Sequence, residues 1–435
     1  MKKVYMVFSA DYIHGGHMDI IQKAASIGEL IVGVLTDRVV AEYKRYPLLP
    51  YEERARIIAG IKGVSRVIPQ RELRYLNNLA EIKPDVVVHG DDWRTGYQMK
   101  IRQEVLEFLK LNGGELIEFP YSSKPEYEQI EGTMRKQAGI PDFRRKKLEK
   151  LLEMKNCVRV IEAHNGISGL IAEETRVYED GKTKQFDAIW VSSLCDSTAK
   201  GRPDIELVDM TSRIRTIDDI MQVTTKPIIL DCDTGGLTEH FVYSIETLER
   251  IGVSAVIIED KIGLKRNSLF GNEVAQEQDS AENFSDKIRA GKRALLTDEF
   301  MLIARIESLI LEKGMDDALL RAHAYVDAGA DGIMIHSRQK SPDEVFEFCG
   351  KFRKVNDRTP LVAVPTSYNE VTEDKLEEHG VNIIIYANQL IRSAFPAMKN
   401  AAELILRYSR AKEADDVCMP IDEILCIIPE KHCGA

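Results

Sequence analysis

Short runs of apolar residues, each followed by a longer amphipathic segment, recur along the chain. A continuous apolar run of this kind is typical of a parallel strand that is buried on both faces, whereas a helix shows the 3.6-residue period. After residue 150 the predicted strands are 158–162, 188–191, 228–230, 253–258, 302–306, 332–335, 361–364 and 383–386. These eight strand–helix units predict an α/β fold of the (β/α)8 barrel type.

The same alternation fills the first 140 residues. The predicted strands there are 3–9, 30–36, 64–68, 86–89 and 114–119, with helices at 17–27, 50–61 and 98–111 among the connections. This pattern predicts a doubly wound, Rossmann-like parallel sheet. A basic helical run is predicted at 144–148, after Gly139 and Pro141. We therefore expect an N-terminal domain of residues 1–140, a linker of residues 141–150 and a barrel of residues 151–435.

Composition and charge narrow the class of protein. The chain has 435 residues, of which 44% are hydrophobic and 30% charged, as expected for a globular protein of two domains. Its net charge of -11 argues against a general nucleic-acid binder, and no stretch is apolar for long enough to span a membrane. Polar residues such as Asp11 interrupt any signal-peptide core, and the seven cysteines form no C-x-x-C pair. We expect a cytoplasmic protein with reduced thiols.

Four successive barrel strands are predicted to end in charged or ionisable residues. These residues are Asp231 and Asp233, Glu259 and Lys261, Arg305 and Glu307, and His336. Taken singly, Arg305 and Glu307 could form a buried ion pair, and His336 could be a core histidine. Since barrel enzymes place their active sites at the carboxyl ends of the strands, the set together predicts an active site.

The motif E-D-K-x5-N-S at residues 259–268, together with the segments 162–166, 364–366 and 387–388, resembles the phosphoenolpyruvate mutase family of the isocitrate lyase superfamily. The resemblance covers essentially the whole predicted barrel. It implies interconversion of phosphoenolpyruvate and phosphonopyruvate with Mg²⁺ as cofactor. It also implies a homo-oligomer in which the last barrel helix is exchanged between subunits.

The resemblance assigns roles to individual residues. Asp231, Asp233 and Glu259 correspond to the Mg²⁺ site, and Mg²⁺ favours such hard oxygen ligands. The catalytic residues that it implies are Arg305 and His336, which hold phosphoryl and carboxylate oxygens, Lys265 and Asn267 on a gating loop, and Asp204 beside the migrating phosphoryl group. The substrate-binding residues that it implies are Trp190, Ser192, Ser193 and Leu194, with Ser268 on the loop.

The gating loop also distinguishes the reactions of this superfamily. Isocitrate-type lyases carry K-K-C-G-H, where this chain has the residues 261–265 without a cysteine. A carbon–carbon lyase is therefore not expected. Asn267 is the mutase version of the loop, and phosphonopyruvate hydrolase is the alternative for this domain.

The N-terminal domain carries a second motif, H-G-G-H at His14–His17, between a predicted strand and a predicted helix. Together with G-D-D-W at residues 90–93, it resembles cytidylyltransferases of the glycerol-3-phosphate type. The resemblance implies that His14 and His17 stabilise the transition state at a helix N-terminus and that Lys44 holds the triphosphate of CTP. The nucleotide-binding residues that it implies are Asp11, Arg54, Asp91, Asp92 and Trp93.

Two departures from the cytidylyltransferase pattern leave an alternative open. The opening G-T-F-D of the family is F-S-A-D at residues 8–11, and its later R-T-x-G-I-S-T-T is absent from the sequence. The fusion favours an enzyme that makes a phosphonate and activates a phosphonate or phosphate monoester with CTP. The alternative is an N-terminal module that binds nucleotide or serves assembly without catalysis.

Overall fold

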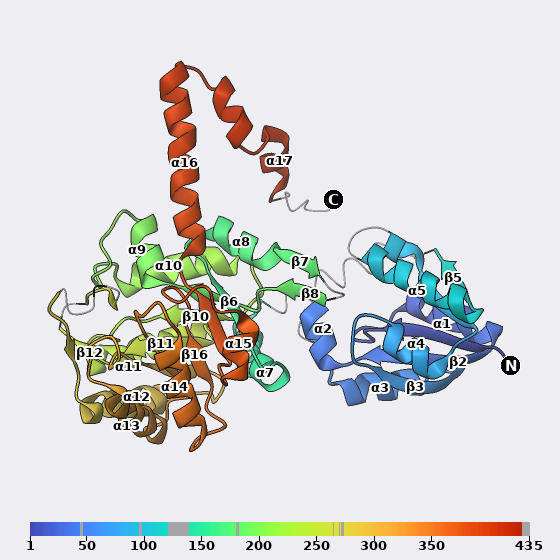
Figure 1. Cartoon of the computed structure of the whole chain (residues 1–435), viewed down its shortest axis with the longest axis horizontal. Helices are drawn as coiled ribbons and strands as arrows, with labels where there is room; N and C mark the ends of the chain where they lie inside the picture. Colours follow the sequence, from blue (N-terminus) through green and yellow to red (C-terminus); the bar gives the residue numbers. More distant parts are fainter. Residues whose placement is uncertain are drawn as a thin grey trace.

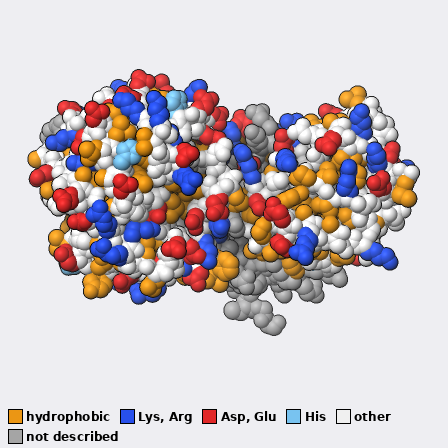
Figure 2. All heavy atoms as spheres, turned by 90° about the horizontal axis from the view of Figure 1, so that it is seen from below, with side chains coloured by type: hydrophobic (Ala, Val, Ile, Leu, Met, Phe, Trp, Pro, Cys, Tyr) orange, Lys and Arg blue, Asp and Glu red, His pale blue; other side chains and the backbone are white. Residues whose placement is uncertain are grey.

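The computed structural model describes residues 1–43, 47–94, 98–120, 139–179, 182–263, 265–268, 270 and 274–428. It consists of two α/β domains that lie side by side, with the N-terminal domain on the right of Figure 1 and the barrel on the left. Acidic and basic side chains are interspersed over the face of both domains that Figure 2 shows.

The N-terminal domain is a parallel sheet covered by helices. Its strands are β1 Lys3–Phe8, β2 Glu29–Leu35, β3 Val64–Gln70, β4 Val86–Gly90 and β5 Glu115–Phe119. Its helices are α1 Gly15–Ile27, α2 Asp37–Tyr43, α3 Tyr51–Ala59, α4 Leu76–Ile82, the 3-10 turn η1 Asp91–Arg94 and α5 Gln98–Asn112. The strand order β3-β2-β1-β4-β5 confirms the predicted sheet. The chain reverses its direction of winding between β1 and β4, and ligands of such sheets bind at this switch point.

The second domain is a closed barrel of parallel strands, as predicted. Its strands are β6 Val158–Glu162, β9 Ala188–Val191, β10 Ile228–Asp231, β11 Ala255–Glu259, β14 Met301–Ile306, β15 Gly332–Ile335, β16 Leu361–Ala363 and β17 Ile383–Tyr386. The helices that follow them are α8 Gly166–Glu174, α9 Ser193–Ala199, α10 Met210–Met221, α11 Thr238–Ile251, α12 Ala281–Ala294, α13 Met315–Asp327, α14 Asp343–Arg353, α15 Glu373–Glu378 and α16 Gln389–Tyr408. The strands are buried on both faces, which explains their continuous apolar runs.

The expected linker of residues 141–150 is instead the first part of a helix, α7 Pro141–Met154, which belongs to the barrel. Leu148 and Leu151 pack among the inward-facing residues of the barrel strands. The basic side chains beside them are not solvated: Arg144 donates to the carbonyl of Thr224 at 2.8 Å and is buried. The chain therefore needs α7 to close the amino-terminal end of the barrel.

Helix α16 projects away from the barrel (Figure 1). None of its residues is buried, although one side of it is apolar: Phe395 is 68% exposed and Leu406 is 80% exposed. The chain continues through η3 Lys412–Val417 and α17 Ile421–Cys426, which turn back beside α16. Within the part of the chain that the structure describes, no helix combines the length and the apolar character needed to cross a membrane.

Candidate functional site

The barrel holds a cavity of about 70 Å³ at the carboxyl ends of its strands. The lining residues are Trp190, Ser192, Ser193, Leu194, Asp204, Asp231, Glu259, Lys265, Asn267, Ser268, Arg305, Met334, His336, Val364, Thr366, Ala387 and Asn388. Every catalytic, substrate-binding and metal residue that the sequence predicted for this domain is in the set, except Asp233. The structure therefore brings together residues from Trp190 to Asn388, which lie about 200 positions apart in the sequence, since the strand ends converge.

Asp233 departs from its expected place. It follows the end of β10 with a φ of 52°, in the left-handed region, so the backbone leaves the strand direction here. Its carboxylate pairs with Lys265 and accepts from Arg213 at 3.1 Å. Among the described residues it pairs with these cations and is not part of the cavity lining, and its role as a metal ligand stays a prediction.

Lys265 connects the loop after β11 with the floor of the cavity. Its Nζ donates to Asp204 at 2.8 Å and also to Asp233 and Ser193. Burial alone would lower the pKa of this amine, but Asp233 and the neighbouring carboxylates outweigh burial and raise the pKa. Lys265 is therefore a fixed positive charge in the site.

Arg305 lies at the centre of a second cluster. Its guanidinium donates to Glu307 at 2.6 Å, to Ser268 at 2.6 Å and to Nδ1 of His336 at 2.8 Å. Burial, and then the positive charge of Arg305, lower the pKa of His336. Nδ1 also lies 3.3 Å from Oε1 of Glu307, but the shorter contact is with Arg305, which can only donate. With Nδ1 as the acceptor of that bond, the neutral ring carries its proton on Nε2, and His336 can donate to a ligand.

Two carboxylates of the cavity fit a divalent cation. Burial raises the pKa of Asp231, but Lys265 and Arg305 outweigh burial and lower it to about 2, so this group is ionised. Burial raises the pKa of Glu259 to about 7, and its buried Oε1 makes no hydrogen bond within the described residues but lies 3.2 Å from Nζ of Lys261. In the described ranges no three acidic, histidine or cysteine side chains converge as a ready metal cage. A pair of carboxylates still suits Mg²⁺, because this ion keeps several of its waters.

The loop that covers the cavity has a defined stem. The two short strands β12 Lys261–Ile262 and β13 Glu277–Gln278 pair antiparallel and bound it. Within the loop Asn267 donates to Asp204 at 3.2 Å, and Ser268 donates to Glu307 at 2.5 Å. Asp204 thus accepts from two loop residues and holds the loop over the cavity.

The prediction missed part of the wall. Met334, Val364, Thr366, Ala387 and Asn388 line the cavity from the ends of β15, β16 and β17. The segments 364–366 and 387–388 carried a resemblance in the sequence, but nothing in their residue types indicated a role. Their position at the carboxyl ends of strands was the available signal.

The N-terminal domain contains a second cavity of about 170 Å³, at the switch point between β1 and β4. Its walls are Met6, Val7, Phe8, Ser9, Gly16, His17, Ile20, Leu35, Leu73, Tyr75, Val88, His89, Gly90, Asp92, Trp93, Gln98, Ile101 and Pro120. His17, Asp92 and Trp93 were predicted here. Tyr75, His89 and Gln98 were not, because no motif distinguishes them.

The paired histidines form the N-terminus of α1. His14 is the N-cap residue, and its Nδ1 accepts from the amide of Gly16 at 3.1 Å. Nδ1 of His17 accepts from the amide of His14 at 3.4 Å, and the two ring centroids are 3.9 Å apart. Because backbone amides occupy both Nδ1 atoms, the neutral rings carry their protons on Nε2. Two imidazole donors at a helix N-terminus suit phosphate oxygens.

Arg54 braces this site. It is fully buried and donates to the carbonyls of Leu35 at 2.8 Å and Leu49 at 2.9 Å, and also to the carbonyl of Ser9. Its remaining nitrogen pairs with Asp37 at 2.5 Å. Because its side chain is fully buried and its three nitrogens are engaged by these groups, Arg54 fixes the ends of β1 and β2.

Asp11 also differs from its predicted role. Its carboxylate accepts from the amides of Leu48 at 2.6 Å and Leu49 at 3.3 Å. Asp11 therefore anchors the segment that precedes α3 and does not line the cavity. Ala10 beside it has a φ of 56°, a left-handed conformation that costs a residue with a Cβ about 1 to 2 kcal/mol.

The G-D-D-W segment forms one wall through its tryptophan. Trp93 is buried, stacks on His89 with ring centroids 3.8 Å apart, and donates to Glu118 at 2.7 Å. Asp92 lines the cavity, whereas Asp91 on the same 3-10 turn does not. Lys44, the predicted triphosphate lysine, lies outside the described residues, as do residues 121–138.

The fold and the two cavities define the class: a (β/α)8-barrel enzyme with a nucleotidyltransferase-like α/β domain before it. The sequence model of the family described as Phosphoenolpyruvate phosphomutase matches residues 148–406, and that of the Cytidylyltransferase-like family matches residues 8–138. The chain belongs to the phosphoenolpyruvate phosphomutase family and carries a cytidylyltransferase-like domain.

Individual relatives cover the barrel. The phosphoenolpyruvate phosphomutase of Tetrahymena pyriformis is 35% identical over 259 residues, which are 59% of this chain and 82% of that protein. The phosphonopyruvate hydrolase of Variovorax sp. is also 35% identical, over 60% of this chain and 87% of its own length. The crystal structure of the phosphomutase from Streptomyces platensis subsp. rosaceus matches 65% of this chain and 93% of its own, with a TM-score of 0.59 and 32% identity. A phosphonopyruvate hydrolase in complex with oxalate and Mg²⁺ matches with a TM-score of 0.58 and 31% identity, over 65% of this chain and 94% of its own.

Proposed function

We propose that the barrel interconverts phosphoenolpyruvate and phosphonopyruvate. The observation that carries this proposal is the loop that covers the cavity, in which Lys265 and Asn267 both donate to Asp204. A mutase must keep water away from the phosphoryl group while that group moves, because a metaphosphate-like species in contact with water is hydrolysed. A covering loop held at two points serves this requirement.

The reaction moves one group within a bound molecule. The bond between phosphorus and the enol oxygen breaks, and phosphorus forms a bond to the methylene carbon, with the reverse sequence in the other direction. The protein contributes positioning and charge stabilisation. Arg305 and His336 present N–H donors to the phosphoryl and carboxylate oxygens, and Lys265 supplies a fixed positive charge next to Asp204.

Mg²⁺ fits this site. Asp231 and Glu259 would hold the ion with its waters, and Asp233 would keep Lys265 and Arg213 in place beside them. The ion would add positive charge next to the oxygens of a small oxo-acid. The solved phosphonopyruvate hydrolase complex with oxalate and Mg⁺⁺ supports this choice of metal and ligand class.

Phosphonopyruvate hydrolysis is the second candidate, because a hydrolase relative is as similar to the chain as a mutase relative is. The experiment that separates them is ³¹P NMR of the full chain with Mg²⁺ and phosphonopyruvate. A phosphoenolpyruvate resonance supports the mutase. Inorganic phosphate together with pyruvate, without phosphoenolpyruvate, would establish the hydrolase instead.

For the N-terminal domain we propose transfer of CMP from CTP to a phosphonate or phosphate monoester. An oxygen of the acceptor attacks the α-phosphorus of CTP, the bond between the α- and β-phosphates breaks, and pyrophosphate leaves. His14 and His17 would donate from Nε2 to the α-phosphate as charge develops there. Pyrophosphate release from CTP with aminoethylphosphonate, hydroxyethylphosphonate or glycerol phosphate tests this activity. CTP binding without release in any of these mixtures would favour a sensing or assembly module, and a preference for ATP would refute the choice of cytidine.

We also propose that α16 packs against a second copy of the chain. Its apolar side chains, and Ile167 and Ile171 on α8, are exposed in the single chain. Exchange of α16 between barrels would cover such surfaces, as the family resemblance implies. Light scattering of the purified chain and of the Phe395→Asp variant tests this, with a loss of the oligomer expected for the variant.

A further inference from the structure

The barrel carries a hairpin that is not part of the barrel wall. Strands β7 Arg176–Glu179 and β8 Lys182–Gln185 pair antiparallel between α8 and β9. The hairpin extends from the barrel to the N-terminal domain (Figure 1), where β8 lies against α2. It therefore links the two domains.

Gln185 at the end of β8 holds the end of α2. Its Nε2 donates to the carbonyl of Ala41 at 3.2 Å and to that of Glu42 at 3.3 Å. The last four carbonyls of a helix have no acceptor role within the helix and need an outside donor. The barrel thus supplies the C-terminal cap of a helix in the other domain.

Helix α2 is also tied to the N-terminal cavity. Asp37 at its start pairs with Arg54, and Val39 and Val40 pack with Leu35, which lines the cavity. Because Arg54 holds one end of α2 and Gln185 holds the other, the position of this cavity wall depends on the hairpin.

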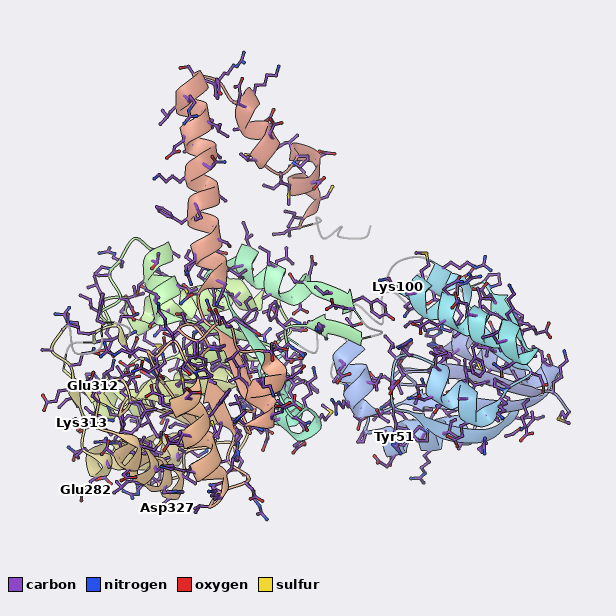
Figure 3. All side chains as sticks on the ribbon, in the orientation of Figure 1. Tyr51, Lys100, Glu282, Glu312, Lys313 and Asp327 are labelled. Atoms are coloured by element: carbon purple, nitrogen blue, oxygen red, sulfur yellow. The ribbon has the colours of Figure 1, made fainter. Side chains whose placement is uncertain are left out.

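Tyr178 on β7 makes the second connection. Its half-buried ring packs against an apolar cluster of the N-terminal domain that includes Tyr75, Trp93 and Ile101. These three residues line the cavity. Nζ of Lys100 on α5, labelled in Figure 3, lies 5.8 Å from the centroid of the Tyr178 ring, a cation–π distance. The ring therefore supports the opposite wall from outside.

We propose that Gln185 and Tyr178 are positioning residues through which the barrel sets the shape of the N-terminal site. Neither residue lines the cavity, so both act through α2 and α5 and not on the ligand. This rests on the proposed function of the N-terminal domain, namely that its cavity binds a nucleotide. The barrel is then a structural component of the N-terminal site as well as an enzyme.

The two tryptophans of the chain allow a direct test, since one lines each cavity. In a Trp190→Phe background, Trp93 is the remaining tryptophan, and its fluorescence is followed as CTP is added to the full-length protein. Gln185→Ala and Tyr178→Ala should each weaken CTP binding about fivefold, which corresponds to about 1 kcal/mol. Val177→Ala, on the exposed side of the same strand, and Tyr178→Phe, which keeps the ring, should bind as the parent does.

Barrel turnover of phosphonopyruvate, measured with Trp190 intact, should not change in any hairpin variant. Unchanged CTP affinity in both alanine variants would overturn the proposal. If the parent binds no nucleotide, the proposed function of the domain fails, and hydrogen exchange of the α2 amides then decides the coupling. Faster exchange of the α2 amides in Gln185→Ala than in Val177→Ala supports the coupling between the hairpin and α2. Equal exchange in the two variants refutes it.

Discussion

Replacing Asn267 with alanine should lower barrel turnover much more than it lowers stability. Asn267 lies half-buried on the covering loop and donates to Asp204 at 3.2 Å. If it also donates to the phosphoryl group in the transition state, its loss removes one preorganised donor. Removal of such a donor typically costs about 100- to 1000-fold in kcat.

The cost in stability follows from the same contact. A hydrogen bond to a charged carboxylate contributes about 1.5 to 3 kcal/mol to the free energy of unfolding, and the partly exposed loop places this one at the lower end, about 1.5 kcal/mol. For a domain of this size that is a shift of about 3 to 6 °C in Tm. The catalytic effect, about 3 to 4 kcal/mol, is therefore about twice as large as the effect on folding.

The assay combines phosphonopyruvate turnover, followed by ³¹P NMR, with thermal unfolding of the same preparations. Glu277→Ala is the matched control, because Glu277 is exposed on the stem strand β13 and does not line the cavity. It should keep both turnover and Tm. Turnover of Asn267→Ala within about threefold of the parent, with Tm lowered by more than about 10 °C, would show that the loop has a structural role, and our reasoning would be wrong.

Three further predictions follow from the two sites. Asp231→Ala should raise the Mg²⁺ concentration needed for half-maximal turnover at least about tenfold, because it removes an ionised ligand group; full turnover at limiting Mg²⁺ would contradict the metal assignment. His17→Ala should lower the rate of pyrophosphate release about 100-fold while CTP affinity, measured by titration calorimetry, changes little. The carboxylate of Glu118 accepts hydrogen bonds from Arg102, Arg94 and Trp93, and the bond from Arg102 is the main cause of its lowered pKa. These ion pairs therefore stabilise the fold at neutral pH. Their contribution is lost as the pH falls through the lowered pKa of Glu118. Glu118→Gln should therefore lower Tm at pH 7, and the difference from the parent should shrink below about pH 4; an equal difference at both pH values would argue against this ion-pair contribution.

The fold was largely predictable because its strands are parallel and fully buried. Such strands appear in the sequence as continuous apolar runs, and those of residues 158–162 and 332–335 match β6 and β15 without a shift. The helical run at 144–148 was predicted within helix α7, but its burial was not. A basic run indicates a solvated linker unless its guanidinium groups find carbonyls, as those of Arg144 and Arg145 do at Thr224 and Glu249.

For the site, the ends of the strands were predictable and the directions of the side chains were not. Asp231 and Asp233 are equivalent in the D-x-D pattern, yet the left-handed backbone at Asp233 gives it a different environment from that of Asp231. The roles of Asp11 and Arg54 likewise depend largely on backbone groups distant in sequence, the amide of Leu48 for Asp11 and the carbonyl of Ser9 for Arg54. Motif spacing contains no information on such partners.

The cations of the barrel site already have anionic partners within the protein. Lys265 pairs with Asp204 and Asp233, and Arg305 pairs with Glu259 and Glu307. A multiply charged anion that enters this buried cluster, in which the carboxylates outnumber these two cations, must therefore be accompanied by a proton or a cation, or it must separate an existing pair. Ligand affinity and cation affinity are consequently linked, and by reciprocity each raises the other by the same factor. Without ligand, the cluster therefore favours an anion that binds together with a cation or a proton. It discriminates against a phosphate ion of the same size that binds without one.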